Sequence, residues 1–251
     1  RLWRFVDVDA ARQLGFPEKR EAHGVLALSR ALYRANRYVQ AAPLLNEALT
    51  KNPDSAIELE QALTDCHLKM QPSQHKVALV HIERLLKLPG LSPRKRDEAY
   101  LLSANVHFAA NNIEACEQAL AQVLETSSAF PQAQALAARV QLQRLPLPKP
   151  GQALTTAEQQ PLQTLIAELQ PLAERKGLEP GVAARLSLLL AQSHERLGKQ
   201  KEAAHFYARI RKLHHGSPEA VAATFLEADW LSGAGQVEES LTLYRRGLQE
   251  A

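Results

Sequence analysis

One short pattern recurs along this 251-residue chain, and the recurrence limits the possible fold more than any other feature. A polar turn with Asn or Gly is followed by a small residue inside an amphipathic stretch. The pattern is visible in NRYVQAAPLLNEALTKNP (36–53), in NNIEACEQALAQVLE (111–125) and in GKQKEAAHFYARI (198–210). Self-similarity at a fixed interval indicates a chain assembled from repeated supersecondary units.

The small residue after each turn serves as a marker of the repeat. Six such markers are Ala41, Ala78, Cys116, Ala167, Ala203 and Ser240, of which Ala167 is the weakest. Their successive intervals are 37, 38, 51, 36 and 37 residues. The long third interval contains a proline-rich insertion, LPLPKPGQALTT (145–156). Six related units therefore cover nearly the whole chain.

Each unit is predicted to be a hairpin of two helices. Ala, Leu, Gln and Glu are abundant and runs of β-branched residues are missing, which favours helices over strands. Ala41, Leu45 and Ala48 give the second helix an apolar face at i, i+4 and i+7. Small marker residues would let the paired helices approach to about 8–10 Å. The first helices are expected in segments 21–35, 56–70, 97–111, 132–145, 181–198 and 219–233.

The punctuation of the units has a physical basis. Asn and Gly tolerate the left-handed conformation that closes a helix, so they are expected in the turn inside each hairpin. The pairs Asn52–Pro53 and Ser217–Pro218 are expected to interrupt the chain before the next unit. No single hairpin can bury its apolar face alone, so neighbouring hairpins must stack.

The pattern resembles the tetratricopeptide repeat, a helix–turn–helix family, over roughly residues 22–251. Unit one carries the resemblance best, unit two has extra residues in its turn (KMQPSQ, 69–74), and unit four, with Pro171 inside its second helix, fits least. The matching residues in units one, five and six are Leu28, Ser29, Leu32, Ala41, Leu45, Ala48, Pro53, Leu190, Ala191, Gly198, Ala203, Tyr207, Ala228, Gly235, Ser240, Tyr244 and Leu248. The resemblance implies an all-α, right-handed superhelical solenoid of antiparallel hairpins.

The family also implies where a partner would bind, on the concave face lined by the first helices. We call the residues at the corresponding positions the inner row. The inner row is Arg30, Tyr33, Thr64, His67, Asn105, Phe108, Gln192, Glu195, Phe225 and Asp229. Family members that clamp a carboxylate pair a Lys with an Asn one turn later. Leu101 precedes Asn105 and Leu26 precedes Arg30, which disfavours that class of adaptor.

Motifs of enzymes and metal sites are missing from the sequence. There is no glycine-rich phosphate loop, no His-Glu-x-x-His, no Cys-x-x-Cys and no Gly-x-Ser-x-Gly. Four histidines of unit five (194, 205, 214 and 215) lack a carboxylate that would complete a metal site. The acid pairs Glu58–Glu60 and Glu238–Glu239 are expected at helix starts or on exposed faces. We therefore expect no enzyme, no cofactor and no metal.

Other side chains are expected to have structural roles. Cys66 and Cys116 stand in apolar patterns and are predicted to be core thiols. Phe206, Tyr207 and Tyr244 are predicted to wedge into the core rather than to form a ligand cage. The net charge of +3 and two short basic clusters (94–96 and 209–215) do not indicate a nucleic-acid partner. No apolar run reaches the length of a membrane span, so no direct insertion is expected.

The expected organisation has four parts. Residues 1–21 would form a further helix that could close a preceding repeat, and 22–144 hold units one to three and the first helix of unit four. Residues 145–156 form the insertion, and 157–251 hold the second helix of unit four with units five and six. The insertion could be a loop that accommodates a changed stacking angle, a docking segment, or a hinge between units one to three and units four to six.

The expected function is a non-enzymatic scaffold that captures a peptide or helix of a protein partner in the concave groove. Two alternatives stay open: a regulatory or targeting domain of a larger enzyme or envelope or secretion assembly, and a self-assembling structural module. Because the chain begins with Arg1 rather than Met, it is expected to be a fragment or a processed form. The compartment stays open.

Overall fold

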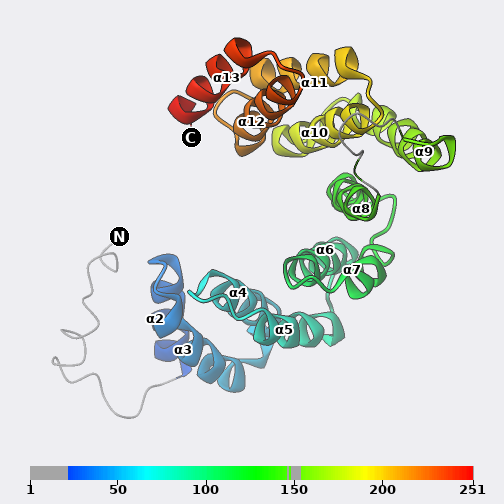
Figure 1. The fold of residues 1–251 in the computed structure, drawn as a ribbon. Coiled ribbons are helices and arrows are strands. Elements are labelled where there is room, and N and C mark those ends of the chain that lie inside the picture. The colour runs from blue at the N-terminus through cyan, green and yellow to red at the C-terminus, as the bar shows by residue number, and fades with distance from the viewer. Residues whose placement is uncertain (1–21, 146, 148–153, 251) are drawn as a thin grey trace. The chain divides into compact units, whose positions relative to one another are not determined.

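The computed structural model describes residues 22–145, 147 and 154–250, and within them the fold is entirely α-helical (Figure 1). The described residues are 79% helical and contain no strand, and within each unit consecutive helices pack against each other. The expected helix in residues 1–21 lies outside the described residues. The chain divides into two compact units, Arg1–Ser127 and Ser128–Ala251.

The first unit contains three helical hairpins, in which α2 packs on α3, α4 on α5 and α6 on α7. Adjacent hairpins also pack, through α3 with α4 and through α5 with α6. The short 3₁₀ helix η2 (Pro53–Ser55) follows the first hairpin. The helices are α2 (Ala22–Arg34), α3 (Tyr38–Lys51), α4 (Ala56–Lys69), α5 (His75–Lys87), α6 (Pro93–Ala109) and α7 (Ile113–Leu120).

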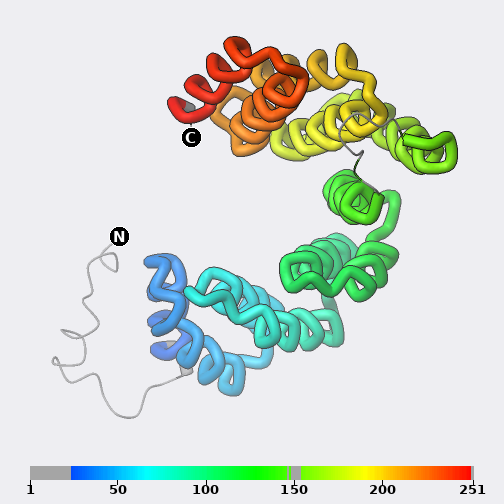
Figure 2. The backbone as a smooth tube through the Cα atoms, viewed as in Figure 1, coloured from blue at the N-terminus to red at the C-terminus, as the bar shows by residue number. Residues whose placement is uncertain are grey.

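The second unit contains α8 and α9 followed by two closely packed hairpins, α10 with α11 and α12 with α13 (Figure 2). Helix α9 packs mainly on α10, with a smaller contact to α8. Pro161 and Pro171 both lie inside α9. The helices are α8 (Phe130–Arg144), α9 (Thr156–Ala173), α10 (Pro180–Arg196), α11 (Gln200–Leu213), α12 (Pro218–Gly233) and α13 (Val237–Glu250). All six predicted first helices are present, as α2, α4, α6, α8, α10 and α12.

Four hairpin turns share one backbone geometry. The second residue after the first helix has positive φ: 59° at Asn36, 56° at Asn111, 70° at Gly198 and 80° at Gly235. In each turn the next amide donates to the carbonyl five residues back, at 2.8–3.0 Å, as Schellman caps do. The expected left-handed turns are thus confirmed. The α4–α5 turn differs, since Met70 is extended there and the Gln74 amide donates to the His67 carbonyl.

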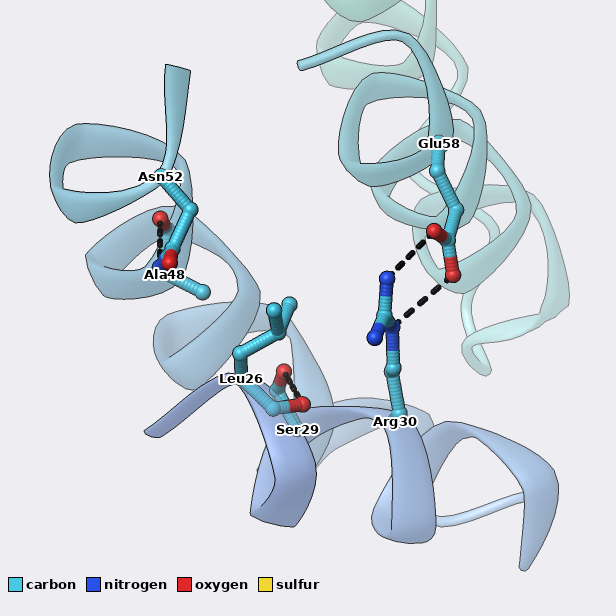
Figure 3. Close-up of polar contacts among 6 residues, drawn as sticks. All are labelled: Leu26, Ser29, Arg30, Ala48, Asn52 and Glu58. Atoms are coloured by element: carbon cyan, nitrogen blue, oxygen red, sulfur yellow. Dashed lines mark hydrogen bonds and ion pairs between the residues drawn. The ribbon is translucent and has the colours of Figure 1, made fainter. Parts of the chain in front are cut away.

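The breaks between hairpins are also as expected. Asn52 follows α3, and its side-chain amide donates to the Ala48 carbonyl at 3.0 Å, which satisfies one of the last carbonyls of the helix (Figure 3). Ser217 caps α12 by accepting a hydrogen bond from the Ala220 amide at 3.1 Å, with Pro218 at the first helical position.

Five of the six marker residues lie in the core. Ala41, Ala78, Cys116, Ala203 and Ser240 are buried, as expected for residues between paired helices. Ala167 is exposed, so the marker assigned to unit four was wrong. Helix α9 instead buries four residues on its other side: Leu162, Leu165, Leu169 and Ala173.

One continuous core joins the helices on both sides of the proline-rich insertion. Ala135, Ala138 and Leu142 of α8 lie in the same apolar cluster as buried leucines of α9 and α10. The Arg196 guanidinium of α10 also donates to the carbonyls of Leu142 and Leu145, at 2.5 and 3.0 Å. The insertion therefore does not separate two cores. The chain does divide between units one to three and units four to six, but the division falls at residues 127–128 rather than at the insertion. The docking and hinge interpretations of the insertion stay predictions. Residues 146 and 148–153 lie outside the described part.

Candidate functional site

The first two inner-row residues connect two first helices. The Arg30 guanidinium of α2 forms two hydrogen bonds with the Glu58 carboxylate of α4, at 2.9 and 2.5 Å (Figure 3). Tyr33 lies one turn further along α2, and its hydroxyl donates to Asp65 Oδ2 of α4 at 2.7 Å. Both contacts lie on one face of α2, because the residues are three apart. They align α2 and α4 side by side.

The environment of Tyr33 keeps its hydroxyl protonated. Burial of the ring raises the pKa of Tyr33 far above its usual value, and the hydrogen bond to Asp65 raises it further. Tyr38 packs edge-on against the Tyr33 ring, with the centroids 6.2 Å apart. The tyrosine therefore acts as a hydrogen-bond donor, held in place by an aromatic neighbour.

Two inner-row residues of α4 lie inside the first unit instead of on a binding face. Thr64 is fully buried, and its hydroxyl donates to the Glu60 carbonyl at 2.8 Å. His67 is also buried, with Nδ1 2.8 Å from Gln74 Oε1, while its Nε2 has no hydrogen-bond partner among the described residues. No partner could touch Thr64 without a rearrangement of the hairpin.

The same interior contains a buried acid–imidazole pair that the sequence interpretation missed. Glu60 was expected to be exposed, but its carboxylate is buried and lies 2.6 Å from His81 Nδ1 of α5. The His81 ring stacks on the His67 ring, with centroids 5.3 Å apart and planes within 7°. A signal was present in α4, because Glu60, Thr64 and His67 follow the i, i+4, i+7 spacing of a buried stripe.

The third pair of inner-row residues lies on α6. Asn105 is exposed, and its side-chain amide nitrogen donates to the Leu101 carbonyl at 2.8 Å. Phe108 is half-buried one turn later. An exposed amide beside an aromatic ring can bind a peptide backbone by hydrogen bonding and stacking.

In the second unit, inner-row acids of α10 and α12 accept hydrogen bonds from tyrosines of the paired second helices. The Tyr207 hydroxyl donates to Glu195 Oε2 at 2.5 Å, and the Tyr244 hydroxyl donates to Asp229. Burial raises the pKa of Glu195, although the Tyr207 hydrogen bond and Arg196 oppose that rise. Burial also raises the pKa of Tyr207, and Glu195 adds to the rise. Each pair links the two helices of one hairpin.

The remaining inner-row positions of this unit are half-buried. Gln192 lies one turn before Glu195 on α10, and the Phe225 ring of α12 lies 6.2 Å from the Tyr244 ring, centroid to centroid. The Arg185 guanidinium of α10 pairs with Glu219 of α12 at 3.1 Å. Sequence reasoning missed this pair, although its 34-residue separation is close to the repeat interval.

The structural roles expected for several other side chains are confirmed. Cys66 and Cys116 are free, buried thiols, and burial raises the pKa of Cys66 to about 11 and that of Cys116 in the same direction. Tyr207 is buried as predicted, and Phe206 packs against two core clusters. Glu238 and Glu239 are exposed at the start of α13.

Two kinds of feature are missing from the described residues. Within 22–145, 147 and 154–250, no three His, Cys, Asp or Glu side chains are grouped to hold a metal ion. In the same ranges, each helix is too short or too polar to cross a lipid bilayer.

Comparison with known proteins gives no assignment by similarity. No protein-family model matches the chain, and no curated protein is significantly similar to it in sequence.

Proposed function

We propose that this chain is a non-enzymatic interaction scaffold, a divergent solenoid like those of tetratricopeptide-repeat proteins, right-handed as in that family. A peptide or helix of a protein partner would bind along the first helices of its hairpins. The observation that carries the proposal is the direct pairing of first helices from successive hairpins. Arg30 with Glu58 and Arg185 with Glu219 form such pairs, one in each unit.

These pairings place first helices side by side, which a linear binding surface requires. The partners of the two ion pairs are 28 and 34 residues apart. One pair joins α2 to α4 and the other joins α10 to α12, so in both units a first helix lies beside the next first helix. Exposed ion pairs contribute little to stability, about 0–1 kcal/mol each. What the two pairs share is that each joins first helices of successive hairpins, which supports a role in arranging the face rather than in holding the fold.

The accessible inner-row residues suggest how a partner would be recognised. Asn105 and Asp229 are exposed, Arg30, Gln192 and Phe225 are half-buried, and each offers a different interaction. Side-chain amides bind peptide backbone, the rings stack on apolar side chains, and the charges select polar ones. Thr64 and His67 would support this surface from beneath rather than touch the partner.

Site-specific crosslinking tests the proposal within each unit separately. A photoreactive amino acid replaces Asn105 in one variant and Gln192 in another, and the protein is irradiated in an extract. The matched controls carry the same residue at Asn46 of α3 and Lys201 of α11, which are exposed on second helices. We expect the same partner bands from the first-helix positions and none from the controls.

The affinity of a variant then decides whether the crosslinked face is a binding site. The variant Asn105→Ala with Arg30→Ala should lose at least tenfold in affinity for the captured partner in a purified binding assay. Helical content by circular dichroism should be unchanged, because both residues are partly or fully exposed. Equal crosslinking from second-helix positions, or undiminished affinity of the double variant, would contradict the groove proposal.

A further inference from the structure

The last described helix carries an apolar stripe that no other described helix covers. Helix α13 packs on α12 through its buried side, which includes Ser240 and Gly247. Beside that buried side, Val237, Leu241 and Leu248 remain 54%, 42% and 73% exposed. Isolated exposed apolar side chains are ordinary, but three on one side of a single 14-residue helix form a surface that can dock another helix.

The spacing of this stripe is that of a coiled-coil seam. Val237, Leu241, Tyr244 and Leu248 are separated by four, three and four residues, the alternation of d and a positions in a heptad repeat. Tyr244 is half-buried, since its ring packs near Phe225, and it occupies the middle of the seam. We call these four residues the α13 seam.

The charges beside the seam complement a reversed copy of the same helix. Glu238 and Arg245 are seven residues apart, so they occupy the same flanking heptad position on one side of the seam. Both are exposed, and neither forms an ion pair with another described residue. In an antiparallel pair related by a two-fold axis, each flank faces the same flank of the partner. Glu238 of each copy would then face Arg245 of the other.

We propose that a second copy of this chain docks here, with the two α13 helices antiparallel and the α13 seams packed together. The two-fold axis would pass close to residues 241–244, so Val237 would meet Leu248 of the other copy. Two equivalent Glu238–Arg245 ion pairs would border the contact on its open side. This proposal is independent of the partner-binding face.

A parallel arrangement of the two helices does not use these charges. Glu238 would lie level with Glu238 of the other copy, and Arg245 level with Arg245. The flank opposite Glu238 would carry Ser240 and Gly247, which are buried against α12. The charge pattern therefore selects the antiparallel pair over the parallel one.

Sedimentation velocity on the purified 251-residue chain tests the proposal. A contact between two single helices is small, so we expect a weak dimer that forms between about 10 and 500 μM. Leu248→Glu should abolish the dimer in this range. Glu238→Arg and Arg245→Glu should each weaken it about tenfold, because each change breaks two symmetry-related pairs and places like charges together.

Exchanging the two charges gives the decisive test of the antiparallel register. The double variant Glu238→Arg with Arg245→Glu should restore the dimer to within about threefold of wild type. An equimolar mixture of the two single variants should form a heterodimer more tightly than either variant dimerises alone. Leu213→Glu, which changes a leucine of α11 that is 60% exposed, is the matched control and should leave the dimer intact.

Several outcomes would overturn the proposal. A wild-type protein that stays monomeric throughout the range would do so. A dimer that Leu248→Glu leaves unchanged would place the contact elsewhere, and failure of both the double variant and the mixture to recover would refute the antiparallel register. Circular dichroism of every variant should match wild type, since all the changed side chains are exposed. None of these measurements requires a partner protein, so they are separate from the test of the groove.

Discussion

The two compact units bury different kinds of side chain behind similar hairpins. The first unit encloses an acid–imidazole pair, Glu60 with His81, and a second imidazole stacked on it. The second unit builds its largest core cluster from leucines, alanines and a valine of α8, α9 and α10. Its polar pairs, such as Tyr207 with Glu195, lie outside this cluster, because Tyr207 belongs to a second apolar cluster and Glu195 is half-buried. The repeat pattern constrains backbone and spacing, and leaves the chemistry of the interior free to vary.

The units also close their hairpins with different residues. The left-handed turn position holds Asn36 and Asn111 in the first unit, but Gly198 and Gly235 in the second. The hydrogen bonds are the same in all four turns. Asn is a residue that adopts this conformation at modest cost, whereas Gly adopts it at none. One backbone requirement has thus been met by two side-chain solutions.

The largest difference between the units should follow from breaking the buried pair. His81→Ala leaves the Glu60 carboxylate, only 5% exposed, without its partner. Removing one member of a buried pair typically costs about 3–5 kcal/mol of unfolding free energy. Hydrogen exchange measured by mass spectrometry should show the loss of protection in α4 and α5.

The matched control replaces both members of the pair. Glu60→Leu with His81→Leu removes the charge and the imidazole together, and the stability change should lie within about 1 kcal/mol of zero or be favourable. Glu58→Ala, which removes the exposed partner of Arg30, should cost less than about 1 kcal/mol. If the double variant is as unstable as His81→Ala, then packing by the imidazole, not burial of charge, dominates this interior.

The apolar core of the second unit should respond to cavity formation instead. Leu186 of α10 is fully buried in the cluster that joins α8, α9 and α10. Leu186→Ala should destabilise the unit by about 3 kcal/mol, from lost burial and the cavity left behind. Leu186→Met should cost less than about 1.5 kcal/mol. Protection should fall in all three helices, and a loss confined to α10 would show that α8 does not share this core.

A smaller effect is expected at the Tyr207–Glu195 pair, outside that cluster. Tyr207→Phe keeps the ring and removes the hydroxyl that donates to Glu195, which should cost about 1–2 kcal/mol. Because this hydrogen bond lowers the pKa of Glu195, its loss should raise that pKa further above the usual value. Carboxyl NMR titration measures the change. An unchanged pKa would mean that the hydrogen bond does not form in solution.

Much of this architecture could be predicted from the sequence because it depends on local spacing. The apolar periodicity located six first helices, and the Asn and Gly residues located four turns with positive φ. The marker at Ala167 failed because α9 buries a leucine stripe on another side of the helix. Small residues are common in helices, so a small residue without a preceding Asn or Gly turn is weak evidence for the second helix of a repeat unit.

The candidate site was harder to predict because it depends on contacts between helices. Thr64 and His67 were placed on a surface by position in the repeat, but α4 packs against both α3 and α5 and has a broader buried side. Glu60 was placed at a helix start or on an exposed face because acids there favour the helix dipole. Its partner His81 is 21 residues away on another helix, and only the tertiary structure shows that the two meet.

The smallest expected effect concerns the turn residues themselves. No atom would contact a Cβ at Gly198 or Gly235 within 4 Å, so Gly198→Ala should cost only the conformational penalty of positive φ, about 1–2 kcal/mol.

Asn111→Gly tests the converse, since it relieves that strain but adds freedom to the unfolded chain, and should change stability by less than about 1 kcal/mol. Gly24→Ala, which is in helical α2 with no atom near its Cβ, is the control and should be stabilising. Urea denaturation of the four proteins measures these differences. If Gly198→Ala were as stable as wild type, the penalty of positive φ would not explain why the turns of the second unit carry Gly where those of the first unit carry Asn.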